Sequence, residues 1–246
     1  MPSAAQLLAL IGQNPDDNDL RLDYADELAK TRDPRGEFIR AQVQLARFGE
    51  NDRRAPKLRT RIKSLLRAHG DDWIRTCPAW ARPFRMQHEF DRGFLKHFST
   101  SVAQWCTKAP ALLKQTPVHT LDLSDARPKL SKLAKCETLR CVRVLDLGYR
   151  MIDDDELEAL AASPNVANLT ALLLWRSGVG PDAARAIGNS PHLQHLTWLN
   201  LEENNIETAG ATALAESKYL QRLRVFSIRS NRMQAAAGRA FARSRI

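Results

Sequence analysis

The stretch VRVLDLGYRMI at residues 142–152 decides the fold, because it returns three times in the same register. The later copies are LTALLLWRSGV at 169–179, LTWLNLEENNI at 196–206 and LRVFSIRSNRM at 223–233, each 27 residues after the one before. One apolar column through the four copies is Leu145, Leu172, Leu199 and Phe226. A related segment, VHTLDLSDA, begins at Val118. Within each copy apolar side chains alternate with outward ones, so five strands are predicted.

The segments between the strands have a different period. DDDELEALAAS, PDAARAIGNS and AGATALAES place apolar residues at i, i+3 spacing, which predicts a helix in each. These helices end at Ser163, Ser190 and Ser217. A unit of one strand and one helix cannot cover its own apolar side, so stacked units are expected to bury a continuous core.

The shared pattern LxxLxLxxN-x-[IL] resembles that of the leucine-rich-repeat family, and units of 27 residues are most similar to its ribonuclease-inhibitor subtype. The resemblance implies an α/β fold, a short solenoid with a parallel sheet on its concave face, preceded here by an α-helical unit. The family's asparagine stands at Asn204 and Asn231 but is replaced by Arg150 and Ser177. We therefore expect less regular turns in the first two of these repeats.

The N-terminal sequence predicts helices over residues 4–12 and 18–30, and a third helix that begins after a Pro/Gly turn. Residues 7–42, LLALIGQNPDDNDLRLDYADELAKTRDPRGEFIRAQ, resemble the bacterial repeat-companion domain, a module that precedes leucine-rich repeats. The resemblance implies an architecture and carries no activity. The predicted division is a helical unit with a basic helix at 1–70, a cap at 71–117 and the solenoid at 118–246.

The predicted cap at 71–117 is rich in large aromatic side chains. They are Trp73, Trp80, Trp105, Phe84, Phe90, Phe94 and Phe98. Such residues bury large areas, and the first repeat of a solenoid needs a cover for its open end. Residues 94–98 are expected to add an irregular first strand.

Composition bounds the class of protein. The 246 residues are 43% hydrophobic and 26% charged, and no apolar run reaches the length of a membrane span. The first residues lack the pattern of a secretory signal, so a cytoplasmic protein is expected. Four cysteines without CxxC pairs predict reduced, mostly buried thiols and no zinc site.

The net charge of +9 is uneven, since residues 51–150 hold 21 of the 37 Lys and Arg side chains and only nine acids. Arg59, Lys63 and Arg67 fall on one stripe of the helix predicted over 53–67. Two interpretations stay open: a solvated helix face, or a contact to phosphates or to an acidic partner. The second gives an alternative function, binding of nucleic acid or of an anionic surface through residues 51–150.

The leading prediction concerns residues between the inward leucines, which point outward from the sheet. The predicted partner-binding residues are Tyr149, Leu173, Trp175, Arg176, Trp198, Glu202 and Arg229. An aromatic centre with a charged rim is typical of a protein-binding hot spot. The competing interpretation is that Trp175 and Trp198 pack on each other across strands, or that the N-terminal helices cover them.

No pattern in the sequence argues for catalysis. Gly178 and Gly180 fall at a repeat turn, which explains them without a phosphate loop. His192 and His195 have no third metal ligand nearby, and the acids at 153–155 suit a helix start. We therefore predict a non-catalytic scaffold for an unknown protein partner, with no cofactor, no metal and no membrane. A monomer is expected unless the last strand's edge self-associates.

Overall fold

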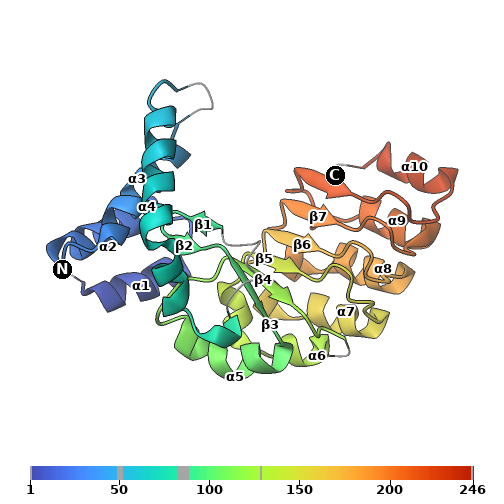
Figure 1. The fold of residues 1–246 in the computed structure, drawn as a ribbon. Coiled ribbons are helices and arrows are strands. Elements are labelled where there is room, and N and C mark those ends of the chain that lie inside the picture. The colour runs from blue at the N-terminus through green and yellow to red at the C-terminus, as the bar shows by residue number, and fades with distance from the viewer. Residues whose placement is uncertain (1, 49–51, 82–88, 128, 245) are drawn as a thin grey trace. The chain divides into compact units, whose positions relative to one another are not determined.

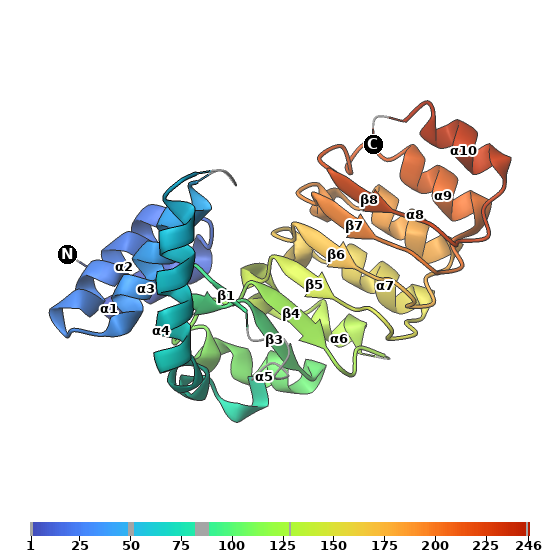
Figure 2. The same cartoon turned by 45° about the horizontal axis from the view of Figure 1, so that its top comes forward.

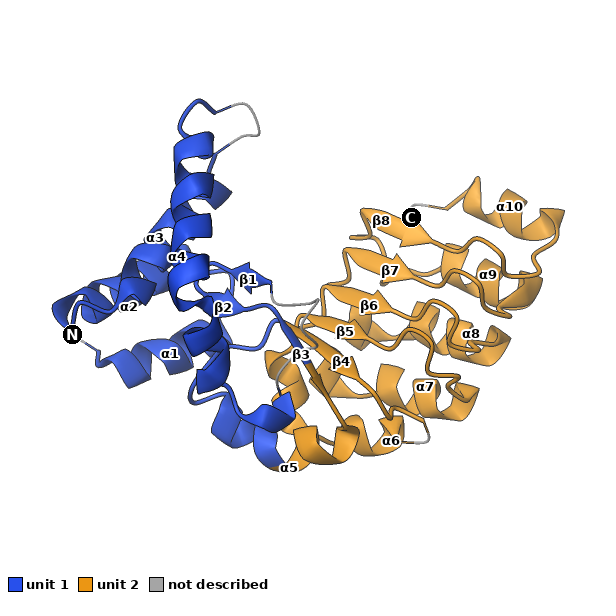
Figure 3. Cartoon of the chain, viewed as in Figure 1, with its two compact units in different colours: residues 1–98, 108–119 blue, residues 99–107, 120–246 orange. Residues whose placement is uncertain are grey.

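The computed structural model describes residues 2–48, 52–81, 89–127, 129–244 and 246. The chain forms two compact units, shown in Figure 3. Unit 1 consists of residues 1–98 and 108–119, and unit 2 of residues 99–107 and 120–246. The division into segments at residues 70 and 117 stays a prediction. Of the aromatic residues expected in the cap, Phe84 lies outside the described residues.

Unit 2 is built on a six-stranded sheet whose strands follow chain order (Figure 1). The strands are β3 (His97–Thr100), β4 (Thr120–Leu123), β5 (Val144–Asp146), β6 (Ala171–Leu173), β7 (Trp198–Asn200) and β8 (Val225–Ser227). From β4 to β8 neighbouring strands are parallel, and from β5 onward paired residues are 27 positions apart. The five predicted strands and their register are confirmed.

The extra strand lies at 97–100 rather than at the expected 94–98. Phe94 and Leu95 form β2 (Phe94–Leu95), which pairs antiparallel with β1 (Phe90–Asp91) in a separate hairpin. The hairpin bonds satisfy the backbone of residues 94 and 95, so the sheet strand begins only at His97. A helix, α5 (Val102–Leu112), follows this strand.

The helices of unit 2 line one side of β4–β8 (Figure 2). They are α6 (Leu130–Leu133), α7 (Asp154–Ala161), α8 (Pro181–Asn189), α9 (Glu207–Ala215) and α10 (Ala235–Phe241). Short 3-10 turns at Glu137–Cys141, Pro164–Val166 and Pro191–Leu193 lead into the next strands. The inward leucines of β5 to β7 and the apolar helix residues are buried, which is the continuous core that the periodicity predicts.

A serine ladder joins consecutive helix ends in unit 2. The hydroxyls of Ser163, Ser190, Ser217 and Ser244 donate to the carbonyls of Ala134, Ala161, Gly188 and Ala215, one repeat earlier. Each of these hydroxyls also accepts the N–H two residues further on. The serines at the predicted helix ends therefore form hydrogen bonds between consecutive repeats. Ser244 continues the series, 27 residues after Ser217.

The turns after the strands keep one side-chain contact to the previous repeat despite the replaced asparagines. Asn204 Nδ2 donates to the Leu174 carbonyl of the previous repeat, while its Oδ1 accepts the N–H groups of Ser177 and Val179. Ser177 Oγ donates to the Leu147 carbonyl at 2.7 Å, and Arg150 Nε to the Leu123 carbonyl at 2.6 Å. A hydroxyl or a guanidinium thus supplies the donor that the carbonyl needs. A guanidinium cannot accept N–H groups as Asn204 Oδ1 does, so the expected irregularity of the first turns stays a prediction.

The described residues of unit 1 form four α-helices ahead of the β1–β2 hairpin, a 3-10 turn at Ala79–Ala81 and the end of α5. The helices are α1 (Ala4–Gln13), α2 (Asn18–Lys30), α3 (Pro34–Ala46) and α4 (Ala55–Thr76). Ser3, Asp17 and Asp33 cap the first three through side-chain oxygens, as their positions before each helix favour. The basic helix is longer than the predicted 53–67, because Trp73 continues its buried face beside Phe38.

The hairpin is attached to the helices of unit 1 by single polar contacts. Gln42 accepts the Gly93 N–H and donates to the Phe90 carbonyl. Arg21, which is 2% exposed, donates to the carbonyls of Arg92 and Pro15, and burial lowers its pKa to about 10. Arg35 Nε donates to the Gly93 carbonyl. These contacts satisfy backbone groups of the hairpin. They stabilise a two-stranded hairpin that would be too short to be stable alone.

The cysteines differ from the prediction of four reduced thiols. Cys106 in α5 and Cys136 after α6 form a disulfide, with Cα atoms 5.7 Å apart, within the range that a disulfide requires. Cys77 and Cys141 take no part in this disulfide. The pairing bridges 30 residues and depends on how α5 lies against the first repeat, which spacing alone does not reveal. Among the described helices, none is long and apolar enough to cross a membrane.

Candidate functional site on the outward face of the sheet

The outward face of the sheet carries an exposed apolar pair. Trp198 begins β7 and is 42% exposed, and Val225 begins β8 and is 50% exposed. The two residues are register partners on adjacent strands. Large apolar side chains seldom stay in water when a core is available, and here the sheet holds both on the same side of the inward leucines. Val225 was not among the predicted partner-binding residues.

Trp175 lies differently from Trp198, because its indole rests on the backbone of Gly148 one repeat earlier. A Cβ at Gly148 would overlap the indole Nε1, so only glycine leaves room for the ring. Tyr149 packs edge-on against the same indole with ring centroids 4.2 Å apart. Trp175 is therefore half-buried, whereas Tyr149 is 51% exposed.

A row of polar contacts continues from Tyr149 at the same turn position in successive repeats. Arg176 Nη1 donates to Tyr149 Oη at 3.2 Å, and its Nε donates to a Glu203 carboxylate oxygen. The Glu203 carboxylate raises the pKa of Arg176, so its charge is fixed. All three residues have φ between 51° and 60°, a left-handed turn that brings their side chains side by side.

A second ion pair joins the segment that follows β7 to the segment that follows β8. Arg229 Nη2 lies 2.9 Å from Glu202 Oε1, and both side chains lie on the outward face. Such exposed pairs contribute little to stability, about 0–1 kcal/mol, so their effect is on the charge pattern of the face. The face thus has aromatic and apolar groups bordered by two Arg–Glu pairs.

The structure separates the two tryptophans that the sequence grouped together. Trp198 pairs with Ala171, and Trp175 is four residues further along the same strand direction, roughly 13 Å away at the usual rise of a strand. Half-buried Leu173 lies between these levels. Among the described residues no ring contact joins the two tryptophans, and Trp175 packs against Tyr149 instead. Met151, 58% exposed beside Tyr149, was not predicted, since the pattern assigned that position no role.

The alternative anion-binding residues lie on unit 1. Arg59, Lys63 and Arg67 are exposed on α4 at successive turns. Across the described ranges of the chain, no acidic side chain forms an ion pair with any of the three. The predicted basic stripe is present as a surface, and its role stays a prediction.

The acids and histidines considered for a metal have other contacts. Asp154 Oδ1 accepts the Gly180 N–H, and its Oδ2 accepts the N–H groups of Asp182 and Ala183, so the carboxylate caps α8 of the next repeat. His195 Nδ1 lies 3.1 Å from a guanidinium nitrogen of Arg222. No cluster of His, Cys, Asp and Glu suited to a metal ion occurs in the part of the chain that the structure describes.

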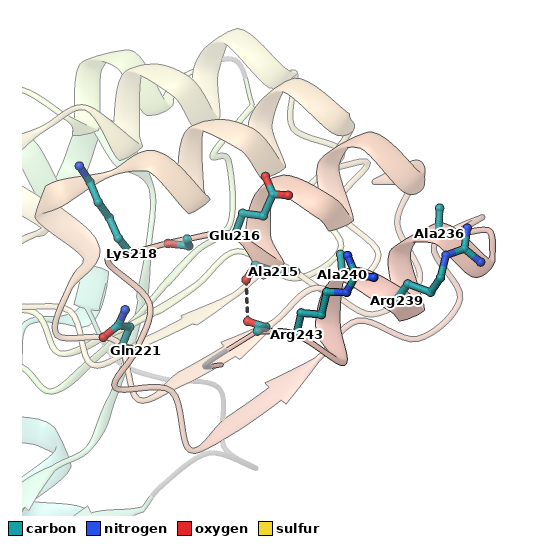
Figure 4. Close-up of a pocket in the computed structure, with 10 residues that line it drawn as sticks. Ala215, Glu216, Lys218, Gln221, Ala236, Arg239, Ala240 and Arg243 are labelled. Carbon is teal, nitrogen blue, oxygen red and sulfur yellow. Dashed lines mark hydrogen bonds between the residues drawn. The ribbon is translucent and has the colours of Figure 1, made fainter.

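An open cavity of about 440 Å³ lies between the ends of α9 and α10 (Figure 4). Its lining includes Glu216, Lys218, Arg239 and Arg243, and the serine ladder bond from Ser244 to the Ala215 carbonyl crosses its floor. A cavity of about 340 Å³ occupies the equivalent place between α7 and α8. The hollow is therefore a repeated consequence of helix stacking and has no chemistry of its own.

Comparison with protein families agrees with this geometry. A family model described as leucine rich repeat matches residues 192–215, a segment that contains β7 and α9. The chain therefore carries leucine-rich repeats. No curated protein matches the chain. Leucine-rich repeats generally mediate protein–protein interactions and are typically non-catalytic.

Proposed function

We propose that unit 2 is a non-catalytic scaffold that binds a protein partner through the outward face of β5 to β8. The observation that carries the proposal is the exposed pair Trp198 and Val225 on adjacent strands of a sheet with a fixed register. The backbone that presents them is held by the pairing of β7 with β8, so a partner would not have to order it first.

The arrangement matches what the energetics of binding favour. An exposed tryptophan beside a β-branched residue removes a large apolar area from water when a partner covers it, and such residues carry most of the affinity of an interface. The pairs Arg176–Glu203 and Glu202–Arg229 border the apolar groups and would select a partner with complementary charges. Tyr149, Leu173 and Trp175 extend the same surface.

Several finer assignments belong to the same proposal. The 27-residue repeats are of the ribonuclease-inhibitor-like type, and the N-terminal helices are a bacterial repeat-companion domain. The protein acts as a cytoplasmic monomer without cofactor or metal. The support for the two family assignments is the resemblance of residues 7–42 and of the four repeat copies to those families.

The test compares partner capture by the native protein and by Trp198→Ala with Val225→Ser. We expect the double variant to lose at least about tenfold in affinity for a captured partner, since hot-spot truncations cost about 2 kcal/mol or more. Leu10→Ala is the matched control, because Leu10 is an exposed apolar side chain of unit 1.

A photo-crosslinking residue at Asn200 locates the contact independently. Asn200 lies on the outward face of β7, and Glu158 on α7 is an exposed control position among the helices. The partner should crosslink from position 200 and not from 158. Equal capture by the double variant, or crosslinking only from position 158, would show that the outward face is not the binding surface.

A further inference from the structure

The disulfide Cys106–Cys136 ties the segment before β4 to the segment after α6. Residues 99–107, the cover segment, comprise the end of β3 and the first half of α5, and β3 lies beside β4 in the sheet. Both cysteines are half-buried rather than enclosed in the core. A disulfide that small thiols can reach is more readily reduced than an enclosed one, so this bond is open to reduction while the protein stays folded.

The hydrogen bonds that hold the cover segment lie at its beginning. The Val102 N–H donates to Asp125 Oδ1 at 2.7 Å, and the Thr100 carbonyl accepts the N–H and the hydroxyl of Ser124. These bonds fix the end of β3 and the first residue of α5. The disulfide joins the helix to the first repeat one turn further along, so its reduction removes the restraint at that turn.

Each cysteine has beside it a buried polar atom that forms no hydrogen bond with the described residues. Trp105 precedes Cys106 and is fully buried, and its indole Nε1 has no acceptor. Thr138 lies two residues after Cys136 and buries an unpaired hydroxyl. A buried donor without a partner destabilises the closed state, because it has given up its bond to water. Local opening would return both groups to water.

The groups around Cys136 favour its reduced form. Lys132 and Lys135 precede it by four residues and by one, and both are exposed, while Glu137 is the acid that follows it. A net positive surrounding stabilises a thiolate, and a stabilised thiolate leaves faster when a disulfide is attacked. The Lys132 carbonyl lies 3.5 Å from Cys136 Sγ, so it can accept a hydrogen bond from the thiol formed there.

The other two cysteines are poorly placed to replace either member of the pair. Cys77 belongs to unit 1. Cys141 follows Cys136 by five residues, and burial raises the pKa of its thiol, so that thiol stays protonated at neutral pH. The thiolate, and not the thiol, attacks a disulfide. Exchange in unit 2 is therefore expected to involve Cys106 and Cys136 alone.

We propose that Cys106 and Cys136 form a redox switch that closes the cover segment when oxidised and lets it open locally when reduced. The reductant is glutathione or a dithiol of the same chemistry. Its thiolate attacks one sulfur to form a mixed disulfide, while the other cysteine leaves as a thiolate and takes up a proton. A second thiolate then releases the first cysteine, so the reductant becomes a disulfide as two electrons and two protons reach the protein.

Opening has a structural consequence at the start of the sheet. It brings Trp105 into water and loosens β3 from the edge of β4, and a freed strand edge can pair with another chain. The switch concerns this end of unit 2 and does not depend on the proposed binding by the outward face of β5 to β8.

The first experiment equilibrates the native full chain with mixtures of reduced and oxidised glutathione that span the cytosolic range. Thiols are then alkylated and assigned by peptide mass. We expect Cys106 and Cys136 to convert together, with half of the chains reduced inside that range. A pair that stays oxidised throughout, or that is reduced only as the protein unfolds, would make the bond a structural cross-link and overturn the proposal.

The second experiment compares hydrogen exchange in the oxidised and the reduced chain. Exchange across residues 99–107 should become about 100-fold faster on reduction, while α8 and β7 exchange as before. Cys106→Ser with Cys136→Ser should exchange like the reduced chain at every glutathione ratio. Unchanged exchange at 99–107 would contradict the switch, and so would an equal rise throughout unit 2, which indicates general destabilisation.

A variant tests the part played by the buried polar groups. Thr138→Val keeps the shape of the side chain but removes the unpaired hydroxyl, so opening of the reduced chain should become about fivefold rarer or more. Thr60→Val, at an exposed position of unit 1, is the matched control and should leave the opening unchanged. Equal opening in the native chain and in Thr138→Val would show that these groups do not drive the switch, and would overturn it in this form.

Discussion

The polar contacts of unit 2 recur with the 27-residue period, whereas those of unit 1 are each made once. Four serines repeat one bond to the previous helix, and Arg150, Ser177 and Asn204 repeat one bond to the previous strand. In unit 1, Arg21, Arg35 and Gln42 hold one hairpin. A contact that recurs in every repeat tolerates exchange of its donor residue, because the neighbouring repeats make the same contact. A contact that is made only once depends on one residue type.

Substitution of a glycine by alanine gives the largest expected difference in the free energy of unfolding between the two units. Gly93 has φ +97°, and a Cβ there would overlap Ile39, a fully buried side chain of α3. We expect Gly93→Ala to lower the free energy of unfolding by about 4 kcal/mol, from backbone strain and overpacking together. Hydrogen exchange should rise across α3 and the hairpin. Protection equal to the native protein would show that the hairpin is not required.

Gly148→Ala is the matched change in unit 2. The added Cβ meets the indole of half-buried Trp175, which can swing outward into water. We expect a cost below about 1 kcal/mol together with a red shift of tryptophan fluorescence. A cost equal to that at Gly93 would contradict the difference between the units.

The disulfide gives the next largest effect, at the start of unit 2 where the repeat is not yet regular. Reduction of Cys106–Cys136, or Cys106→Ser with Cys136→Ser, should lower the free energy of unfolding by about 3 kcal/mol, because the bond closes a loop of 30 residues in the unfolded chain. Cys141→Ser is the control, since Cys141 is a free thiol. Urea midpoints that match with and without reductant would show that the cross-link does not form in solution.

A smaller effect than that of the disulfide is expected from the asparagine in the turns of the repeats. Asn204→Ala leaves the N–H groups of Ser177 and Val179 and the Leu174 carbonyl without their partner, at a cost of about 2 kcal/mol. Asn204→Ser should cost less, because Ser177 shows that a hydroxyl can make the carbonyl bond one repeat earlier. Urea unfolding measures both variants, and equal costs would mean that the donor to the carbonyl contributes nothing.

The sequence determined the solenoid of this protein: five strands, their register, the inward leucines and the helices between them. This was readable because each repeat contacts its sequence neighbours, so the constraint on every column is local and periodic. The same columns identified the outward residues, including Trp175 and Trp198. Gly148 lies one repeat period before Trp175. This glycine was the feature of the sequence that could have indicated that the Trp175 indole would be partly covered.

Only the tertiary structure decided how those outward residues are used. Whether a tryptophan is exposed depends on the size of its neighbour in the next strand, and whether Asp154 caps its own helix or the next depends on which N–H groups come within reach. The disulfide depends on the packing of α5 against the first repeat. Such contacts join residues without a shared period, so no pattern along the chain specifies them.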